Sequence, residues 1–406
     1  YEHEEKEQSE FAEWKKSRLE AMGPDEKAAL VKDEEAFEDF QEEPDSAEDL
    51  SKIPSLSIDD IPRTVETIVT FSGDINGVPF YSLDVFTNGI VYVDLAFDIQ
   101  DLAGDYLPLF PFFCRAAAAA GLPGMPYDKV AQQLAIKTGG FSSFLEVNSV
   151  DGYDELVAGE RRRRSRAFVV FRLKTLETGF GEAMDLAASL IQTADFSDRA
   201  RMKDLFLEFR NDVKAQILPS GSSFTSLRAG SHLSPVFARE EQWKGIEQVR
   251  FLYDTASDID ARIDGICSDL EKMRRLLLAK SRLTINLTAH SKIHGEAERT
   301  FGSFIDTLPA GESGNFIFEL PCNTDGLRTE SIVLPSAVNF ASTVLPASSF
   351  VSSEHAHEVV VAQMLKTNYL WEHVRMRGGA YGVSSSVNGG EMLFSFSSYR
   401  DPNITS

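Results

Sequence analysis

The positions of hydrophobic residues divide the chain into strand-like and helix-like stretches. Short apolar or alternating runs bounded by turn residues predict strands, at residues 65–71, 78–86, 90–97, 168–173 and 283–287. Longer stretches with helical spacing predict helices, at residues 106–120, 127–138, 181–193, 197–218, 243–252, 259–280 and 297–308. Asn88-Gly89 indicates a hairpin between the second and third strands. Because strands and helices come in groups without βαβα alternation, we predict an α+β fold with antiparallel-rich sheets and packed helices.

The last block of the chain repeats the order of strands, helix and strands. Predicted strands and a long helix fall at residues 331–334, 338–344, 354–375 (the helix), 381–387 and 392–399. The last two strands form a hairpin around Asn388-Gly389-Gly390. The helices that would complete a layer are missing, so we expect a domain that is truncated. The predicted organisation is a helical region at 1–50, a domain at 51–327 and part of a further domain at 328–406.

The first 50 residues predict an acidic helical hairpin. Apolar residues fall on one face of each helix, namely Phe11, Trp14, Leu19 and Met22 in the first and Leu30, Phe37 and Phe40 in the second. Gly23-Pro24 breaks the pattern, and Pro24 can open the second helix. The apolar stripes are narrow, so we expect a connector that lies against a larger body. A disordered acidic tail is the alternative interpretation.

The charge of the chain excludes some partners. With 63 acidic and 40 basic residues the net charge is −23, which disfavours a general binder of nucleic acid or of anionic membranes. Residues 1–50 carry 19 acids and 6 bases, a net of −13. More than half of the charge therefore belongs to the hairpin and does not establish an acidic binding surface.

The cysteines and the chain ends indicate an intracellular piece of a longer protein. Cys114, Cys267 and Cys322 are too few and too far apart for a disulfide framework or a zinc ribbon. The most apolar stretch, residues 107–125, is interrupted by three prolines and an arginine, so a buried helix is expected and no membrane span. The chain begins with a charged stretch after Tyr1, without a signal peptide or an initiating methionine.

The histidines form no recognisable metal motif. Neither H-E-x-x-H nor H-x-x-E-H occurs among the seven histidines. His290 and His294 are four residues apart, but they lie where a strand meets a helix, and a chance pair on a solvated turn is favoured over a ligand pair. His355 and His357 are two residues apart and point to different helical faces. We therefore predict that this chain holds no metal.

Other catalytic patterns are also missing from the sequence. No G-x-S-x-G elbow, phosphate-binding loop or strand-linked G-x-G-x-x-G is present. Cys114, within LFPFFC, is expected to be a small core residue. The basic run at 161–166 lacks interleaved aromatic residues and is interpreted as a solvated loop at the edge of the sheet, paired with acids.

The segment YLWEHVRMRGGAYG, residues 369–382, is the strongest candidate for chemistry. A helix ends in Arg375 and Arg377, Gly378 and Gly379 turn the chain, and Tyr381 begins the next strand. Cations followed by glycine are ordinary chemistry for the end of a helix, so a purely structural interpretation is open. A guanidinium and a phenol around one tight turn could together donate hydrogen bonds to a peptide carbonyl and its oxyanion, which is the functional alternative.

This segment resembles the C-terminal signature of the presequence-protease subfamily of the pitrilysin, or inverted-zincin, metallopeptidases. Residues 44–62 (PDSAEDLSKIPSLSIDDIP), residues 77–98 with LDVFTNGIVYVDLAFD, and FSFSSYRDPN near the end resemble that subfamily too. In this family four related α+β domains form two halves joined by a helical hairpin, and the halves close around an unfolded peptide. The resemblance implies that the chain is the hairpin, the third domain and part of the fourth.

The resemblance also implies that the two halves of the protein supply different catalytic groups. The N-terminal half of the same polypeptide carries H-x-x-E-H and binds Zn, whose water attacks the peptide bond. By motif position Arg375 and Tyr381 contact the substrate and its oxyanion, with Gly378 and Gly379 forming the substrate-binding turn; Arg377 is a second arginine that the sequence does not separate from Arg375. Residues 106–120 lie where a related domain carries the zinc motif and contain no histidine.

The functional hypothesis is thus the C-terminal portion of a zinc metalloendopeptidase that degrades short unstructured peptides such as presequences and is inactive alone. The alternative is a non-catalytic peptide-binding or assembly protein on the same fold. The implied compartment is the cytoplasm for a bacterial protein and the mitochondrial matrix for a eukaryotic one.

Overall fold

The computed structural model describes residues 2–42, 44–102, 104–157, 160–311, 318–322 and 329–403. It contains two compact units, Tyr1–Thr67 and Ile68–Ser406. The predicted boundary between residues 327 and 328 lies outside the described residues, and the blocks on its two sides belong to the same unit.

The first unit is helical, as the sequence predicts. It contains the helices α1 (Glu2–Ala21), α2 (Pro24–Glu42) and α3 (Ala47–Lys52). The break falls where it was predicted, because Pro24 is the first residue of α2 and the Gly23 N–H donates to the Glu26 carboxylate at 3.0 Å. Phe11 and Trp14 stack at 5.7 Å between ring centroids and are 64% and 62% exposed. The apolar stripe of α1 is therefore open to solvent.

The second unit is built on a seven-stranded sheet in the order β1-β2-β6-β3-β5-β4, with β7 also paired to β5. Its strands are β1 (Thr70–Ile75), β2 (Val78–Asp84), β3 (Ile90–Asp98), β4 (Gly140–Val157), β5 (Glu160–Leu176), β6 (Leu283–Ala289) and β7 (Phe318–Cys322). Only the pairing of β2 with β6 is parallel among these strands. The predicted α+β class with antiparallel-rich sheets is confirmed.

The hairpin predicted at Asn88-Gly89 is wrong, although the turn itself exists. β6 lies between β2 and β3, so these two strands do not pair with each other. A two-residue hairpin turn of this sheet is at Asn76-Gly77, where residues with positive φ angles of 51° and 84° join β1 to β2. This turn fixes β1 at Thr70–Ile75, so the strand predicted at 65–71 is displaced, and residues 65–69 are not in a strand.

The basic run at 161–166 was predicted to be a loop and is part of β5 instead. β5 extends from Glu160 to Leu176 and pairs with β4, a strand that the sequence reading missed. On its other side β5 pairs with β3 and β7, so the backbone of the run is inside the sheet. Arg166 forms an ion pair with Asp98 at 2.6 Å, as the expected pairing with acids requires.

Most predicted helices of this unit are present. They are α4 (Phe110–Ala119), α5 (Tyr127–Lys137), α6 (Phe180–Thr193), α7 (Arg199–Ile217), α8 (Gly221–Gly230), α9 (Pro235–Lys244), α10 (Ile246–Ser257), α11 (Ile259–Leu277) and α12 (His294–Asp306). α8 was missed, and the helix predicted at 243–252 is split between α9 and α10 at Gly245. Glu241 causes the split, because its carboxylate accepts from the Ile246 N–H at 2.8 Å and so caps α10.

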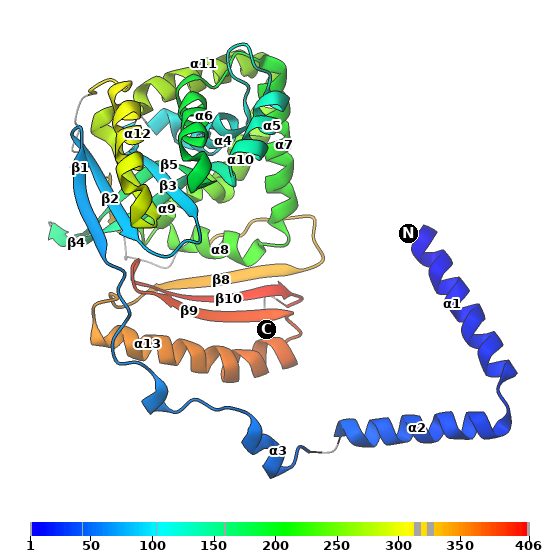
Figure 1. Ribbon diagram of the computed structural model, residues 1–406. Helices are drawn as coiled ribbons and strands as arrows, with labels where there is room; N and C mark the ends of the chain where they lie inside the picture. Colours follow the sequence, from blue (N-terminus) through cyan, green and yellow to red (C-terminus); the bar gives the residue numbers. More distant parts are fainter. Residues whose placement is uncertain are drawn as a thin grey trace. The chain divides into compact units, whose positions relative to one another are not determined.

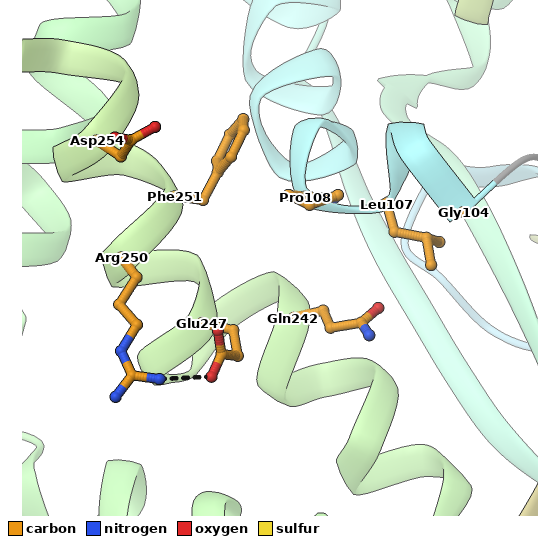
Figure 2. Close-up of a pocket in the computed structure, with 8 residues that line it drawn as sticks. All are labelled: Gly104, Leu107, Pro108, Gln242, Glu247, Arg250, Phe251 and Asp254. Carbon is orange, nitrogen blue, oxygen red and sulfur yellow. Dashed lines mark hydrogen bonds and ion pairs between the residues drawn. The ribbon is translucent and has the colours of Figure 1, made fainter.

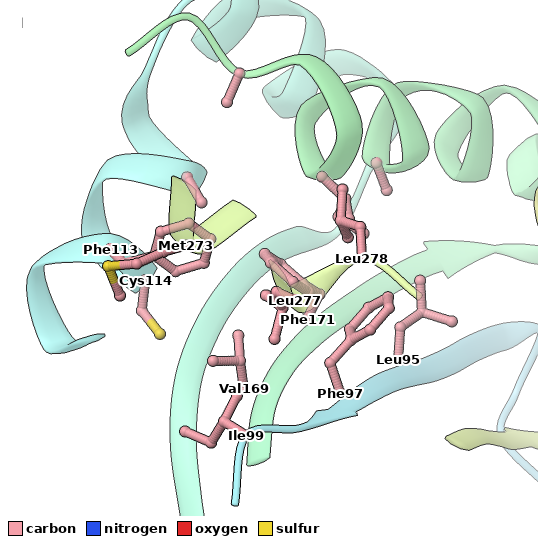
Figure 3. Packing of buried hydrophobic residues seen from close by; sticks show 14 of the residues in the cluster. Leu95, Phe97, Ile99, Phe113, Cys114, Val169, Phe171, Met273, Leu277 and Leu278 are labelled. Atoms are coloured by element: carbon pink, nitrogen blue, oxygen red, sulfur yellow. The ribbon is translucent and has the colours of Figure 1, made fainter. Parts of the chain in front are cut away.

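A hydrophobic core of aliphatic and aromatic side chains lies between this sheet and the helices beside it (Figures 1 and 3). Less than 2% of the surface is exposed for Phe97, Phe110, Phe112, Phe113, Phe171, Phe180, Phe206 and Phe301. Phe112 packs edge-on against Phe206 at 4.9 Å between centroids. Cys114 is a core residue as predicted, and burial raises the pKa of its thiol to about 12. No helix among the described residues is long and apolar enough to cross a membrane.

The second sheet repeats the geometry of the first on a smaller scale. It contains β8 (Asn339–Pro346), β9 (Gly382–Asn388) and β10 (Leu393–Asp401) in the order β8-β10-β9. Between β8 and β9 lies α13 (Ser353–Met364), which continues as the π-helix η6 (Leu365–Arg377). The strand predicted at 331–334 is absent, but the β9–β10 hairpin is confirmed. The order β8-β10-β9 matches β3-β5-β4 of the large sheet.

Close contacts join the two sheets into one unit. α8 packs on β8, where Thr225 and Ser226 hydrogen-bond to Ser342 at 2.6 and 2.9 Å. A Cβ on Gly221 would lie 2.4 Å from the Phe340 ring, so only glycine fits at this contact. The buried Glu391, in the β9–β10 turn, accepts from Ser149 of β4 at 2.8 Å. The second sheet is therefore anchored to the first by polar as well as apolar contacts.

Candidate active-site turn

A tight turn joins η6 to β9 and holds all the site residues that the sequence predicts. The Gly378 and Gly379 N–H groups both donate to the Arg375 carbonyl, the latter at 3.0 Å. The Ala380 N–H donates to the Val374 carbonyl at 3.1 Å. These bonds close the helix end and place the start of β9 directly beside it.

Both glycines are required by this geometry. A Cβ on Gly378 would lie 2.6 Å from the Val374 carbonyl oxygen, a distance at which the backbone must shift. Gly379 has φ of +81°, which side chains rarely adopt. Asn403 fixes the turn from outside, because its amide donates to the Gly378 carbonyl at 3.0 Å. The turn is thus held by backbone hydrogen bonds to η6 and by a side chain that follows β10.

Arg375 and Arg377 have different surroundings. The Arg375 guanidinium lies 3.8 Å from the centroid of the Trp371 ring, one helical turn earlier, and is half-buried. Within the described part of the chain no carboxylate pairs with it. Arg377 is exposed and forms an ion pair with Glu372. Only Arg375 therefore has a pre-oriented guanidinium with N–H groups available to another molecule.

Tyr381 presents its phenol at the surface. It is 68% exposed, and its ring packs edge-on against Tyr399 of β10 at 6.1 Å between centroids. Tyr399 in turn contacts Phe340 of β8 at 5.5 Å. A row of three aromatic rings across the sheet thus holds the Tyr381 ring while its hydroxyl is open. The sequence reading missed Trp371 and Tyr399 as supports; the only signal was the spacing of Trp371, four residues before Arg375.

The described residues do not provide a metal site. No group of three or more His, Cys, Asp or Glu side chains among them could hold a metal ion. His290 lies at the start of a short turn, where its Nδ1 accepts from the Lys292 N–H at 3.3 Å. His294 begins α12. His290 therefore caps this turn.

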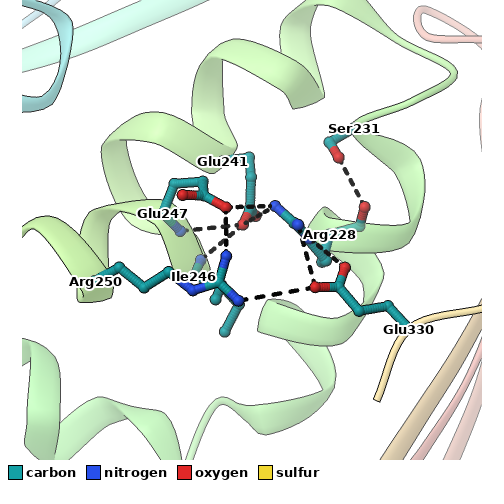
Figure 4. A network of polar contacts seen from close by, with 7 residues as sticks. All are labelled: Arg228, Ser231, Glu241, Ile246, Glu247, Arg250 and Glu330. Carbon is teal, nitrogen blue, oxygen red and sulfur yellow. Dashed lines mark hydrogen bonds and ion pairs between the residues drawn. The ribbon is translucent and has the colours of Figure 1, made fainter. Parts of the chain in front are cut away.

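A network around Arg228 was not predicted from the sequence (Figure 4). Arg228 of α8 bridges Glu330, Glu247 and Glu241, with N–O distances of 2.6, 2.9 and 3.4 Å. Glu241 is 3% exposed, and burial raises its pKa. The Arg228 hydrogen bond lowers the pKa of Glu330. Because the three partners come from three separate segments, local spacing gives no signal for this network.

Replacing Arg228 with methionine is expected to lower the free energy of unfolding by about 2–3 kcal/mol, because it leaves the buried Glu241 without its cation. Arg250→Met is the matched control: Arg250 pairs with Glu247 at 2.8 Å but is 55% exposed, and exposed pairs contribute about 0–1 kcal/mol. Urea unfolding of the two variants gives the comparison. Equal losses would show that Arg228 does not compensate Glu241.

A groove of about 540 Å³ lies between α10 and the short 3-10 helix η2 (Gly104–Leu109) (Figure 2). Leu107, Pro108 and Phe251 give it an apolar floor, with Asp254 and Arg250 at the rim. None of the site residues predicted from the sequence lines it. The candidate residues of the η6–β9 turn therefore lie outside this groove.

Two family models match the chain. The model for the region associated with subfamily C of the M16 peptidases matches residues 1–254, and the model described as "PreP C-terminal domain" matches residues 329–406. The second match contains the whole η6–β9 turn.

Known proteins similar to the chain include presequence proteases. Presequence protease 1, chloroplastic/mitochondrial, of Arabidopsis thaliana is 32% identical over 387 residues, which are 95% of this chain and 34% of that protein. The mitochondrial presequence protease of Yarrowia lipolytica is 26% identical, over 91% of this chain and 36% of that protein. The chain thus spans about a third of the length of these curated relatives.

Solved structures agree on the fold. A protease from Helicobacter pylori superposes with a TM-score of 0.55 at 13% identity, covering 83% of this chain and 76% of that one. The peptidase M16 inactive domain from Pseudomonas fluorescens gives 0.51 at 14% identity, covering 82% and 74%. At these identities the likeness concerns the fold alone.

Proposed function

Because the chain belongs to the presequence-protease subfamily of the M16 peptidases, we propose that it is the C-terminal portion of a zinc metalloendopeptidase that cleaves short unstructured peptides. The observation that carries the proposal is the η6–β9 turn, which holds Arg375 and Tyr381 together within the region matched as the PreP C-terminal domain. Relatives named as presequence proteases support the substrate class.

In this proposal the turn supplies hydrogen-bond donors to the substrate. The Tyr381 hydroxyl donates to the carbonyl oxygen of the bond being cleaved and to the oxyanion that this oxygen becomes. The Arg375 guanidinium, held flat on Trp371, donates to a neighbouring carbonyl and adds positive charge. Donors fixed before the reaction stabilise charge that develops in the transition state, which is the usual source of a large rate effect.

The metal belongs, in this proposal, to another part of the protein. The described residues do not fit a zinc ion, since no cluster of suitable side chains is present among them, and we derive no catalytic step through zinc from this chain. When bound, zinc activates water for attack on a carbonyl. The N-terminal portion of the same polypeptide is the proposed partner that holds it. The compartment, mitochondrial or cytoplasmic, stays a prediction that depends on the source organism.

The test is reassembly. The polypeptide encoded upstream of Tyr1 is produced separately and mixed with this chain, and cleavage of an unstructured fluorogenic peptide is followed. We expect no cleavage by either part alone, cleavage by the mixture, and its loss with a zinc chelator. This mixture is called the assembled enzyme below.

Two results would contradict the proposal. An upstream reading frame without H-x-x-E-H would favour the alternative, a non-catalytic peptide-binding or assembly protein. Zinc-dependent cleavage by this chain alone would show that it holds a metal site of its own.

A further inference from the structure

Arg400 of β10 lies beside the η6–β9 turn, where its carbonyl accepts from the Tyr381 N–H at 3.4 Å. Its guanidinium lies 5.4 Å from the centroid of the Tyr399 ring, the same ring on which Tyr381 packs edge-on. We propose that Arg400 is a specificity-determining residue, which binds a carboxylate of the peptide substrate close to the bond that is cleaved. The inference rests on the proposed function and adds to it a feature by which the site selects its substrate.

A bulge in β10 directs the Arg400 side chain toward this ring. Between Ser398 and Asp401, three steps along β10 correspond to two steps along its partner β8. In a regular strand successive side chains point to opposite faces of the sheet. An extra residue bends the strand and re-aims a side chain, and such bulges are common next to active sites. Here the bulge places the guanidinium on the ring of the preceding residue.

The backbone at Arg400 is strained. Its φ of +49° lies in the left-handed region, which residues with a Cβ rarely adopt. Glycine and asparagine tolerate this region best. Strain of this kind is concentrated at functional sites, where the surrounding structure holds it in place. The chain thus has an arginine at a position where the backbone alone favours a small uncharged residue.

The Arg400 guanidinium has no carboxylate partner within the part of the chain that the structure describes. The carboxylate of its neighbour Asp401 is buried and accepts from the Asn403 N–H at 2.9 Å. Acids are in excess in the chain, 63 against 40 bases, so their scarcity does not explain a lone cation. The exposed Arg400 side chain therefore has N–H groups that suit the two oxygens of a carboxylate from another molecule.

A cation at this place separates peptides by charge. The guanidinium attracts a carboxylate much more strongly than the neutral amide of the same shape. The carboxylate can belong to an acidic side chain of the substrate or to the C-terminus of a short peptide, since both present the same two oxygens. The experiment below distinguishes these two sources.

The test compares peptides that differ in one carboxylate. Fluorogenic unstructured peptides with amidated C-termini carry glutamate or glutamine at one position, which is moved along the residues flanking the cleaved bond. We expect the assembled enzyme to cleave the best-placed glutamate peptide with a kcat/KM about five- to tenfold above that of its glutamine counterpart. A glutamine peptide with a free C-terminus completes the set. A preference for it, instead of for the glutamate peptide, would assign the site to the terminal carboxylate.

Arg400→Gln is expected to remove this preference, because it removes the charge while keeping a polar side chain. Arg400→Lys should keep part of it, since the charge remains without the planar fork. Arg377→Gln is the matched control: Arg377 is exposed beside the same turn, and its loss should leave the preference unchanged. The ratio of the two peptides is the informative quantity, because damage to the fold lowers the cleavage of both peptides alike.

Arg400→Gly makes the result independent of folding defects. Glycine adopts a φ of +49° without strain, so this variant is expected to unfold at no lower urea concentration than the unchanged chain. It should nevertheless lose the preference for the carboxylate. A loss of preference in a chain of full stability cannot come from a damaged fold.

Two results would overturn the proposal. One is the same ratio of the peptides in the unchanged, Arg400→Gln and Arg400→Gly enzymes. The other is an equal loss of preference in Arg377→Gln, which would show that the general charge of the turn and not Arg400 selects the peptide.

Binding of the same peptides to this chain alone separates the inference from the proposed function. The peptides carry a rhodamine label, and fluorescence anisotropy gives their affinities. We expect the same preference for the carboxylate, again lost in Arg400→Gln. Such binding in a mixture that cleaves nothing would keep the carboxylate site and remove the proposed function. Zinc-dependent cleavage with no preference in any variant would remove the carboxylate site while the proposed function stands.

Discussion

Tyr381→Phe in the assembled enzyme is expected to lower kcat by about 10²–10³, equivalent to about 2.7–4 kcal/mol, the usual effect of removing one donor to an oxyanion. The substitution removes only the hydroxyl. The edge-on contact with Tyr399 needs the ring and not the oxygen, so the turn should keep its structure. Because the donor acts mainly in the transition state, KM should change little.

The measurement is steady-state hydrolysis of the fluorogenic peptide, together with the unfolding midpoint of each variant. Tyr369→Phe is the matched control, since Tyr369 is also exposed, at 58%, and packs on His373 in the same helix. We expect it to keep kcat within about twofold, as an exposed hydroxyl without a substrate contact should. A Tyr381→Phe enzyme as fast as the control would remove Tyr381 from the mechanism.

The candidate turn could be predicted from sequence because its determinants are local. Cations at a helix end, two glycines and a following strand are all contained in YLWEHVRMRGGAYG, and the structure places them in one turn. The β9–β10 hairpin was predictable for the same reason. What the sequence could not separate was Arg375 from Arg377, because that difference depends on which side chain each arginine contacts.

The order of strands in the large sheet was not predictable in this way. Asn76-Gly77 and Asn88-Gly89 are equivalent turn signals, yet only the first joins paired strands. β6, almost two hundred residues after β3 in the chain, is inserted between β2 and β3 and pairs with both. Turn residues indicate where the chain bends, but they do not indicate whether a later strand of the sequence is inserted between the two strands that they join.

The charge of residues 161–166 led to a wrong prediction, because backbone pairing and not charge determines the local structure there. The basic run at 161–166 suggested a solvated loop, but β4 and β7 pair with its backbone on both sides. The Arg228 network was equally hidden, since Glu330 is 102 residues from Arg228. β7 beside the basic run and Glu330 beside Arg228 are both distant in sequence from their partners.

The different surroundings of Arg375 and Arg377 lead to a second prediction with a large effect on catalysis. Arg375→Met in the assembled enzyme is expected to lower kcat/KM by about 10²–10³, because it removes a pre-oriented cation that donates to the substrate backbone. Methionine keeps an apolar contact with Trp371, so folding should be preserved.

Arg377→Met is the matched control for that loss, because it removes the same charge two residues away. Its ion pair with Glu372 is between side chains 66% and 55% exposed, and such pairs contribute about 0–1 kcal/mol. We expect the kcat/KM of Arg377→Met to stay within about threefold of that of the unchanged enzyme. The kcat/KM of Arg375→Lys should lie between those of Arg375→Met and Arg377→Met, since an ammonium cannot reproduce the planar fork of the guanidinium. The measurement is peptide hydrolysis by all three variants. A larger loss of kcat/KM in Arg377→Met than in Arg375→Met would assign the substrate contact to Arg377. It would also show that the contact of Arg375 with Trp371 has a structural role.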